Sequence, residues 1–165
     1  MSQVNYRALF AVLVLCVAMM LTTNVQAQQS FRDSIVQAQI LVRSGTRQVL
    51  EEELMLNEEE QAAFWPLYDK FRAEMLIMEE QYIDLVSEFV ESYQAGELTD
   101  EDADRMLDAY HDIQMDALQV RQRYVRHFRK IISGIKLLRF YQLENKVRAE
   151  VDAAFALAIP LADPR

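Results

Sequence analysis

The feature that most constrains this chain is a helix-start pattern that occurs three times. Each copy has an aliphatic residue followed by a side chain whose oxygen can accept hydrogen bonds from the free N–H groups of a first helical turn. In two copies an acidic residue lies three places after the capping residue, as in a capping box, and the aliphatic residue can act as a hydrophobic staple. The copies contain Leu56, Asn57 and Glu60; Leu98, Thr99 and Asp102; and Ile132 and Ser133. The pattern predicts three helix starts and a repeated helical hairpin.

The spacing of the apolar residues predicts four helices, over residues 31–54, 58–94, 100–131 and 134–158. Glycine and proline, which interrupt helices, occur only three times each. In the two long helices, apolar residues recur at steps of four and three that alternate, except that the last two steps in the first helix are both four. This is the seam of helices that pack along their length. The seams are Phe64, Tyr68, Phe71, Met75, Met78, Tyr82, Leu85, Phe89 and Tyr93 in the first, and Met106, Tyr110, Ile113, Ala117, Val120, Tyr124, His127 and Ile131 in the second.

Two positions define the path between and within the long helices. Gly96, in the segment 95–97, suits the left-handed position past a helix end, so we predict a turn there. Pro66 lies inside the first long helix and should bend or interrupt it near residues 59–64. The expected fold is therefore all-α, an elongated antiparallel hairpin of two long helices with two shorter flanking helices. Helices of roughly 45 to 55 Å cannot bury all of their apolar surface in one hairpin, so part of it should face a partner or a ligand.

Residues 1–27 have the pattern of a secretory signal peptide. Arg7 gives a positive start, an apolar run covers residues 8–21, and Ala27 ends a small-residue exit. The apolar run is shorter than the roughly 20 residues that span a bilayer, so we favour cleavage over retention as a membrane anchor. Cys16, the only cysteine, lies in this run, and the mature chain then has no thiol. Residues 28–165 contain no linker-like segment, which predicts a single helical domain.

Charge is segregated along the mature chain. Removing residues 1–27 takes away one basic residue and no acidic one, so the formal net charge changes from −9 to −10, which argues against a nucleic-acid partner. Residues 51–116 are overwhelmingly acidic, and basic residues gather after them. A solvated face with weak ion pairs and a basic recognition surface both remain open. The basic residues are Arg121, Arg123, Arg126, Arg129, Lys130, Lys136, Arg139, Lys146 and Arg148.

The mature chain offers little for catalysis. It has no cysteine, no glycine-rich phosphate loop and only two histidines, so we expect a protein that is not an enzyme and that needs no cofactor. Asp108, His111 and Asp112 lie at helical spacing and are weak candidates for a zinc site, with a solvated acidic face as the alternative. Methionines at seam positions, such as Met75 and Met78, either fill the core or form an adaptable surface for protein clients.

The repeated starts at Leu56-Asn57 and Leu98-Thr99, the export signal and the long hairpin together resemble the Spy/CpxP/ZraP-like group of periplasmic proteins, which is named for LTxxQ motifs. Glu60 and Asp102 stand where that group has glutamine. The resemblance implies a periplasmic, hooked four-helix hairpin that forms a homodimer and binds non-native proteins without ATP in envelope stress. It also implies an alternative, an accessory or inhibitory partner of an envelope-stress or metal-responsive sensor kinase.

We therefore expect periplasmic protein clients, or a periplasmic sensor domain, as partners. The candidate client-binding residues combine the basic cluster that follows residue 120 with two seam methionines. They are Arg121, Arg123, Arg126, Arg129, Lys130, Met75 and Met78.

Overall fold

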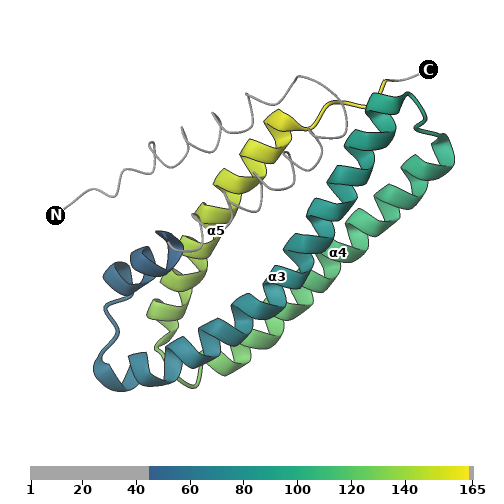
Figure 1. Cartoon of the computed structure of the whole chain (residues 1–165). Helices are drawn as coiled ribbons and strands as arrows, with labels where there is room; N and C mark the ends of the chain where they lie inside the picture. Colours follow the sequence, from purple (N-terminus) through teal and green to yellow (C-terminus); the bar gives the residue numbers. More distant parts are fainter. Residues whose placement is uncertain (1–44, 164–165) are drawn as a thin grey trace. The chain divides into compact units, whose positions relative to one another are not determined.

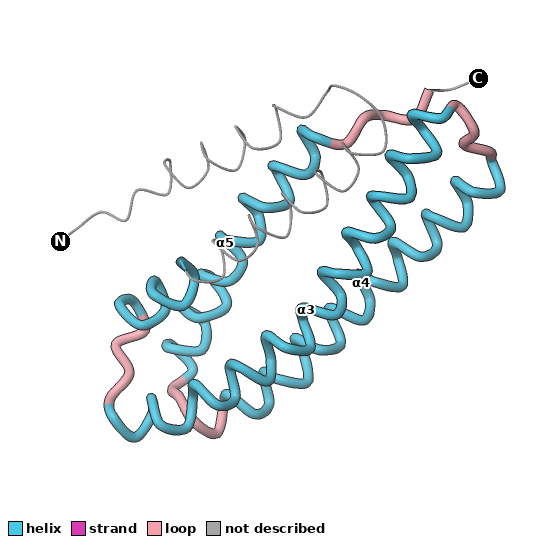
Figure 2. The backbone as a smooth tube through the Cα atoms, in the orientation of Figure 1, coloured by secondary structure: helices cyan, strands magenta, loops and turns pink. Residues whose placement is uncertain are grey.

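The structure is a computed structural model and describes residues 45–163 (Figure 1). Its helices are α3 (Glu58–Ala95), α4 (Asp100–Phe128) and α5 (Gly134–Ala158), and residues 45–53 are also helical. Figure 2 shows short loops between these helices, and none of the described residues forms a strand. The predicted all-α class is confirmed. The predicted signal peptide and residues 31–44 of the first predicted helix lie outside the described residues.

The contacts within the chain divide it into two compact units. One comprises Leu50–Gln142 and contains α3, α4 and the first residues of α5; the other comprises Met1–Val49 together with Leu143–Arg165. The first is called the α3–α4 unit below, and it contains all of the contacts discussed in the following paragraphs. The single domain over residues 28–165 stays a prediction.

All three predicted helix starts are present. The Asn57 side chain accepts a hydrogen bond from the Glu60 backbone N–H at 2.9 Å, and the Glu60 carboxylate accepts one from the Asn57 N–H at 3.0 Å. Thr99 and Asp102 form the same capping box at the start of α4. At the start of α5, the Ser133 hydroxyl accepts from the backbone N–H three residues on, at 3.3 Å. Local sequence therefore sets the first residue of each helix.

The aliphatic residues before the caps are at least partly buried. Leu56 and Leu98 are half-buried and Ile132 is buried. The Leu56 carbonyl also accepts a hydrogen bond from the Gln61 side-chain amide at 2.8 Å. The segment that enters α3 is thus held on both sides of the cap.

We predicted that Pro66 would bend or interrupt its helix, and the interruption is wrong, because α3 continues through Pro66. Proline has no N–H to donate to the carbonyl one turn earlier, that of Ala62, and its ring crowds that carbonyl. Figure 1 shows that α3 curves along its length. A curved helix accommodates one missing hydrogen bond because the bonds on both sides of it remain.

The turn between the long helices is as predicted. Gly96 has a φ of 68° and ends α3, and its N–H donates to the Tyr93 carbonyl at 3.1 Å. The next N–H, of Glu97, reaches back to the Ser92 carbonyl at 3.0 Å, the bond pattern of a Schellman motif. α3 and α4 then lie side by side (Figure 1), with Arg105 bound to Glu88 and, farther from the turn, Tyr124 bound to Glu74.

The predicted seam of α3 is correct only as far as Met75. Beyond Met75 the buried positions are Ile83 and Val86, whereas the predicted Met78, Tyr82, Leu85, Phe89 and Tyr93 are half-buried. In a straight helix, positions that recur every seven residues move by about 20° around the helix axis with each heptad. A step of four in place of a step of three returns the buried positions to the side that faces α4. Glu79 lies four residues after Met75 and four before Ile83, and its carboxylate forms an ion pair with Arg72 at 2.9 Å.

α4 ends at Phe128, three residues earlier than predicted. The N–H groups of Lys130 and Ile131 donate to carbonyls three residues back, the tighter pattern of a 3₁₀ turn. Phe128 is fully buried, and His127, which the seam had placed inside, is exposed. The tight turn brings Ile132 into the core directly before the Ser133 cap.

An aromatic cluster forms the core where the start of α3, the end of α4 and the start of α5 meet. Phe64, Phe71, Phe128 and Phe140 are each at most 2% exposed. The ring centroids of Phe128 and Phe140 are 4.9 Å apart, and that of Phe64 lies 5.2 and 5.4 Å from them. Contacts between aromatic rings stabilise a core beyond the effect of burying their large apolar area.

Within the described part of the chain, no helix is both long and apolar enough to cross a membrane.

Candidate binding surface

The structure separates the predicted client-binding residues into an inner and an outer set. Met75 is only 4% exposed and Met78 is half-buried, so Met75 belongs to the core and not to a client surface. The alternative that it fills the core is the one supported. The basic residues lie on α4 and in the turn that follows it.

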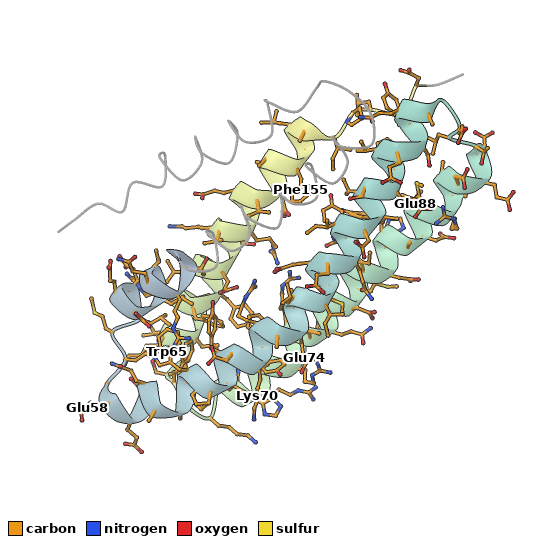
Figure 3. All side chains as sticks on the ribbon, viewed as in Figure 1. Glu58, Trp65, Lys70, Glu74, Glu88 and Phe155 are labelled. Atoms are coloured by element: carbon orange, nitrogen blue, oxygen red, sulfur yellow. The ribbon has the colours of Figure 1, made fainter. Side chains whose placement is uncertain are left out.

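Two of the predicted basic residues are engaged within the α3–α4 unit. Arg123 forms an ion pair with Glu74, a residue labelled in Figure 3, and its guanidinium lies 5.7 Å from the centre of the Tyr124 ring. Arg121 is half-buried, and its carbonyl accepts the Tyr141 hydroxyl hydrogen bond at 2.9 Å. The Arg123 side chain is therefore engaged within the α3–α4 unit and contributes less to a free surface, whereas the bond at Arg121 is made by its backbone carbonyl.

The Tyr124 hydroxyl is part of the same contact. It donates to the Glu74 carboxylate at 2.7 Å from a side chain that is 6% exposed. Burial, with the neighbouring Glu74 carboxylate, raises the pKa of Tyr124 to about 12. A phenol that stays neutral in this position serves as a hydrogen-bond donor between the helices.

The remaining cations are exposed. Arg126, Arg129 and Lys130 form no ion pair with any residue in the 45–163 range, and they follow one another at the end of α4 and in the turn. They are therefore available to an acidic ligand. These are the predicted cations that the structure leaves for recognition.

Large apolar side chains are also exposed on α4 and α5. On α4, Leu107, Met115 and Leu118 are 55%, 54% and 52% exposed, and on α5 Ile135 and Leu138 are 83% and 60% exposed. The three residues on α4 lie between the predicted seam positions of that helix, so the predicted seam did not include them. In the sequence, these residues are visible only as further apolar positions on α4, outside its predicted seam. A helix that exposes both apolar side chains and cations along its length can bind segments that are both apolar and acidic.

The acidic part of α4 provides no metal centre. Asp108 and His111 are exposed, as is Asp112, and among residues 45–163 no three histidine, cysteine or acidic side chains lie close enough together to hold a metal ion. The helical spacing was compatible with a site, but side chains on one exposed helix face diverge into solvent. The zinc hypothesis for these three residues has no support in the structure.

Comparison of the chain with protein-family models, with curated proteins and with solved structures finds no match in any of the three.

Proposed function

We propose that the protein is an exported, periplasmic binding protein that holds non-native protein segments without ATP. The observation that carries the proposal is the exposure of Leu107, Met115 and Leu118 on α4 together with Arg126 and Arg129, which form no ion pair in the described range. Such a surface binds exposed apolar segments by burial and acidic residues by charge.

The length of α4 supports this function, because its exposed residues are spread over a helix of 29 residues. The binding residues lie along a helix and not in a closed cavity, which fits an extended and variable ligand. The exposed residues include a methionine, whose flexible side chain adapts to different partners. The elongated hooked shape and the homodimer implied by the family resemblance are part of the same proposal.

The experiment is an aggregation assay with the protein purified after export. A reduced or heat-stressed client is followed by light scattering at several-fold excess of the protein. Wild type should suppress aggregation, and Leu118→Ser should suppress it several-fold less. Leu157→Ser is the matched control, because Leu157 is an exposed leucine on α5 outside the α3–α4 unit. If wild type remains folded and leaves client aggregation unchanged, the proposed function is wrong.

A second pair of variants tests the charged part of the surface. Arg126→Gln with Arg129→Gln should weaken binding of acidic clients. Lys146→Gln with Arg148→Gln removes the same charge from α5 and should leave that binding unchanged. Equal losses in the two double variants would indicate a general effect of net charge and would contradict a defined surface.

A further inference from the structure

The methionines among the described residues divide into an inner and an exposed set. Met75 and Met106 are 4% and 7% exposed, and Met78 is half-buried. Met55 and Met115 are 77% and 54% exposed. An oxidant in solution therefore reaches the thioethers of these last two residues most readily, because the susceptibility of a sulfur group follows its exposure.

Methionine is the only sulfur-containing residue that the predicted mature chain offers to an oxidant. Cys16, the only cysteine, lies in the predicted signal peptide and would be removed with it. Hydrogen peroxide is uncharged, so the formal net charge of −9 does not keep it away from the protein. Oxidation converts the apolar side chain of methionine into a polar sulfoxide, and sulfoxide reductases reverse the change.

Met115 lies where this change would alter the candidate binding surface. It precedes Leu118 by three residues on α4, so the two exposed side chains share one side of the helix. As a thioether, Met115 presents a flexible apolar group to a ligand. As a sulfoxide, it would present an acceptor oxygen. An apolar segment that covers this oxygen offers it no hydrogen bond, and burying a polar group in this way is unfavourable.

The fold should tolerate a sulfoxide at Met115, because more than half of this side chain is already exposed to water. Met75 and Met106 belong to the core, where a sulfoxide would disrupt the packing. Met55 is exposed, but it lies before α3, where its carbonyl is bonded to Lys136, and not on α4. Of the two exposed methionines, only Met115 is therefore part of the candidate binding surface.

We propose that Met115 is an oxidation site that regulates client binding: the thioether form binds apolar client segments, and the sulfoxide form releases them. This inference rests on the proposed function. With hydrogen peroxide as the oxidant, a sulfur lone pair attacks one peroxide oxygen, so that an S–O bond forms as the O–O bond breaks. The transferred oxygen gives its proton to the departing hydroxide, which leaves as water. The sulfur loses an electron pair and the peroxide gains it, so no further reactant is needed.

The first experiment identifies the sites of oxidation. The protein purified after export is treated with hydrogen peroxide for increasing times, quenched with free methionine and analysed by peptide mass spectrometry. Met55 and Met115 should be oxidised about tenfold faster than Met75 and Met106, because exposure controls the rate. Circular dichroism should stay that of the untreated protein over the same period. The proposal is wrong if Met115 reacts as slowly as Met75, or only when the protein unfolds.

The second experiment measures binding before and after oxidation. The probe is a fluorescent peptide of leucine and glutamate, whose dissociation constant is measured by fluorescence anisotropy. For wild type, peroxide treatment should raise this constant several-fold, and a methionine sulfoxide reductase should restore it. For Met115→Leu, whatever its starting value, the constant should not change on treatment. Met55→Leu is the matched control and should show the same rise as wild type. No rise in wild type, or an equal rise in Met115→Leu, would overturn the proposal.

Failure of the proposed function gives a different result from failure of its regulation. If the untreated protein neither binds the peptide nor suppresses client aggregation, the function itself is wrong, and regulation through Met115 is wrong with it. If the untreated and the oxidised protein bind the peptide equally well, the function stands and only the role of Met115 is wrong.

Discussion

Lys136 and Glu60 are the third residues of α5 and α3, and their side chains form an ion pair that joins the starts of the two helices. The Lys136 ammonium also donates to the Met55 carbonyl at 2.9 Å. Met55 has a φ of 49°, in the left-handed region that non-glycine residues rarely adopt. Arg139, almost one turn farther along α5, donates to the Glu53 carbonyl at 2.7 Å. The basic first turns of α5 thus hold the segment that enters α3 in an unfavourable backbone conformation.

Replacing Lys136 should destabilise the fold more than replacing a free cation. Lys136→Met removes an ion pair and a backbone hydrogen bond at a side chain that is 27% exposed, and leaves the Met55 carbonyl without this donor. We expect a lower urea midpoint, measured by circular dichroism. Lys130→Met is the control and should leave the midpoint unchanged; an equal shift in both variants would contradict the role of the Lys136 contacts.

Stability should fall in acid partly through Glu60. The hydrogen bond from Lys136, followed by that from the Asn57 N–H, lowers the pKa of Glu60 below 4.5. A carboxyl group whose pKa is lower in the folded state stabilises the fold above the unfolded pKa, and this contribution is lost as the pH falls through the folded pKa. Glu60→Gln keeps an acceptor for the cap but not the charge. Its thermal midpoint should therefore depend less on pH below 4.5 than that of wild type.

Glu58→Gln is the matched control for that measurement. It removes a charge from the same first turn of α3 without touching Lys136. Its acid dependence should follow that of wild type. A flattening of the same size in Glu58→Gln would mean that the overall charge of the helix start, and not the Lys136 contact, causes the effect.

At alkaline pH the sensitive group should be Tyr124. Its pKa is raised from 10.0 to about 12 in the folded chain, so between these values the unfolded chain loses a proton that the folded chain keeps. Raising the pH through this window therefore favours unfolding. Tyr124→Phe should have a flatter stability profile above pH 10. At neutral pH its free energy of unfolding should be about 1 kcal/mol lower than that of wild type, the net contribution of one hydrogen bond. Urea unfolding measures this difference. A profile as steep as that of wild type would contradict the assignment.

Replacement by alanine should change the free energy of unfolding differently at Gly96, which follows α3, and at Gly134, which begins α5. At Gly96 a Cβ meets no atom within 4 Å, but the φ of 68° is unfavourable for alanine, so Gly96→Ala should cost about 1 kcal/mol of unfolding free energy. Gly134 is the first residue of α5, and its Cβ position is also open. Gly134→Ala should be neutral or stabilise by up to about 1 kcal/mol. Equal effects at both positions would show that the left-handed turn is not the cause.

The aromatic cluster should dominate stability. Phe140→Ala leaves a cavity between Phe64 and Phe128 and should cost roughly 3 to 5 kcal/mol of unfolding free energy, a large part of the stability of a small domain. Tyr141→Phe, at the next position, removes the hydrogen bond to the Arg121 carbonyl and keeps the ring, and it should cost about 1 kcal/mol of unfolding free energy. Denaturant unfolding of the two variants measures the difference, and similar losses would contradict the central place of Phe140.

Of the candidate binding surface, only the charge was predictable from the sequence. The basic residues after residue 120 are visible in the sequence, but their pairing is not, because Glu74 lies about fifty residues from Arg123 along the chain. The exposure of Leu118 was also hidden. A leucine on a long helix has the same appearance in the sequence whether its side chain faces a neighbour or solvent.

The sequence by itself determined the helix starts at Asn57, Thr99 and Ser133, the turn at Gly96 and the all-α class, because capping and left-handed backbone preferences act within a few residues. Only the tertiary structure decided which positions are buried beyond Met75 in α3 and beyond Tyr124 in α4. A step of four at Glu79 keeps the buried positions of α3 facing α4, and a 3₁₀ turn after Phe128 brings Ile132 into the core. The physical reason is the separation of the contacting residues along the chain. A cap is formed by residues three places apart, whereas burial depends on a second helix that is distant in the sequence.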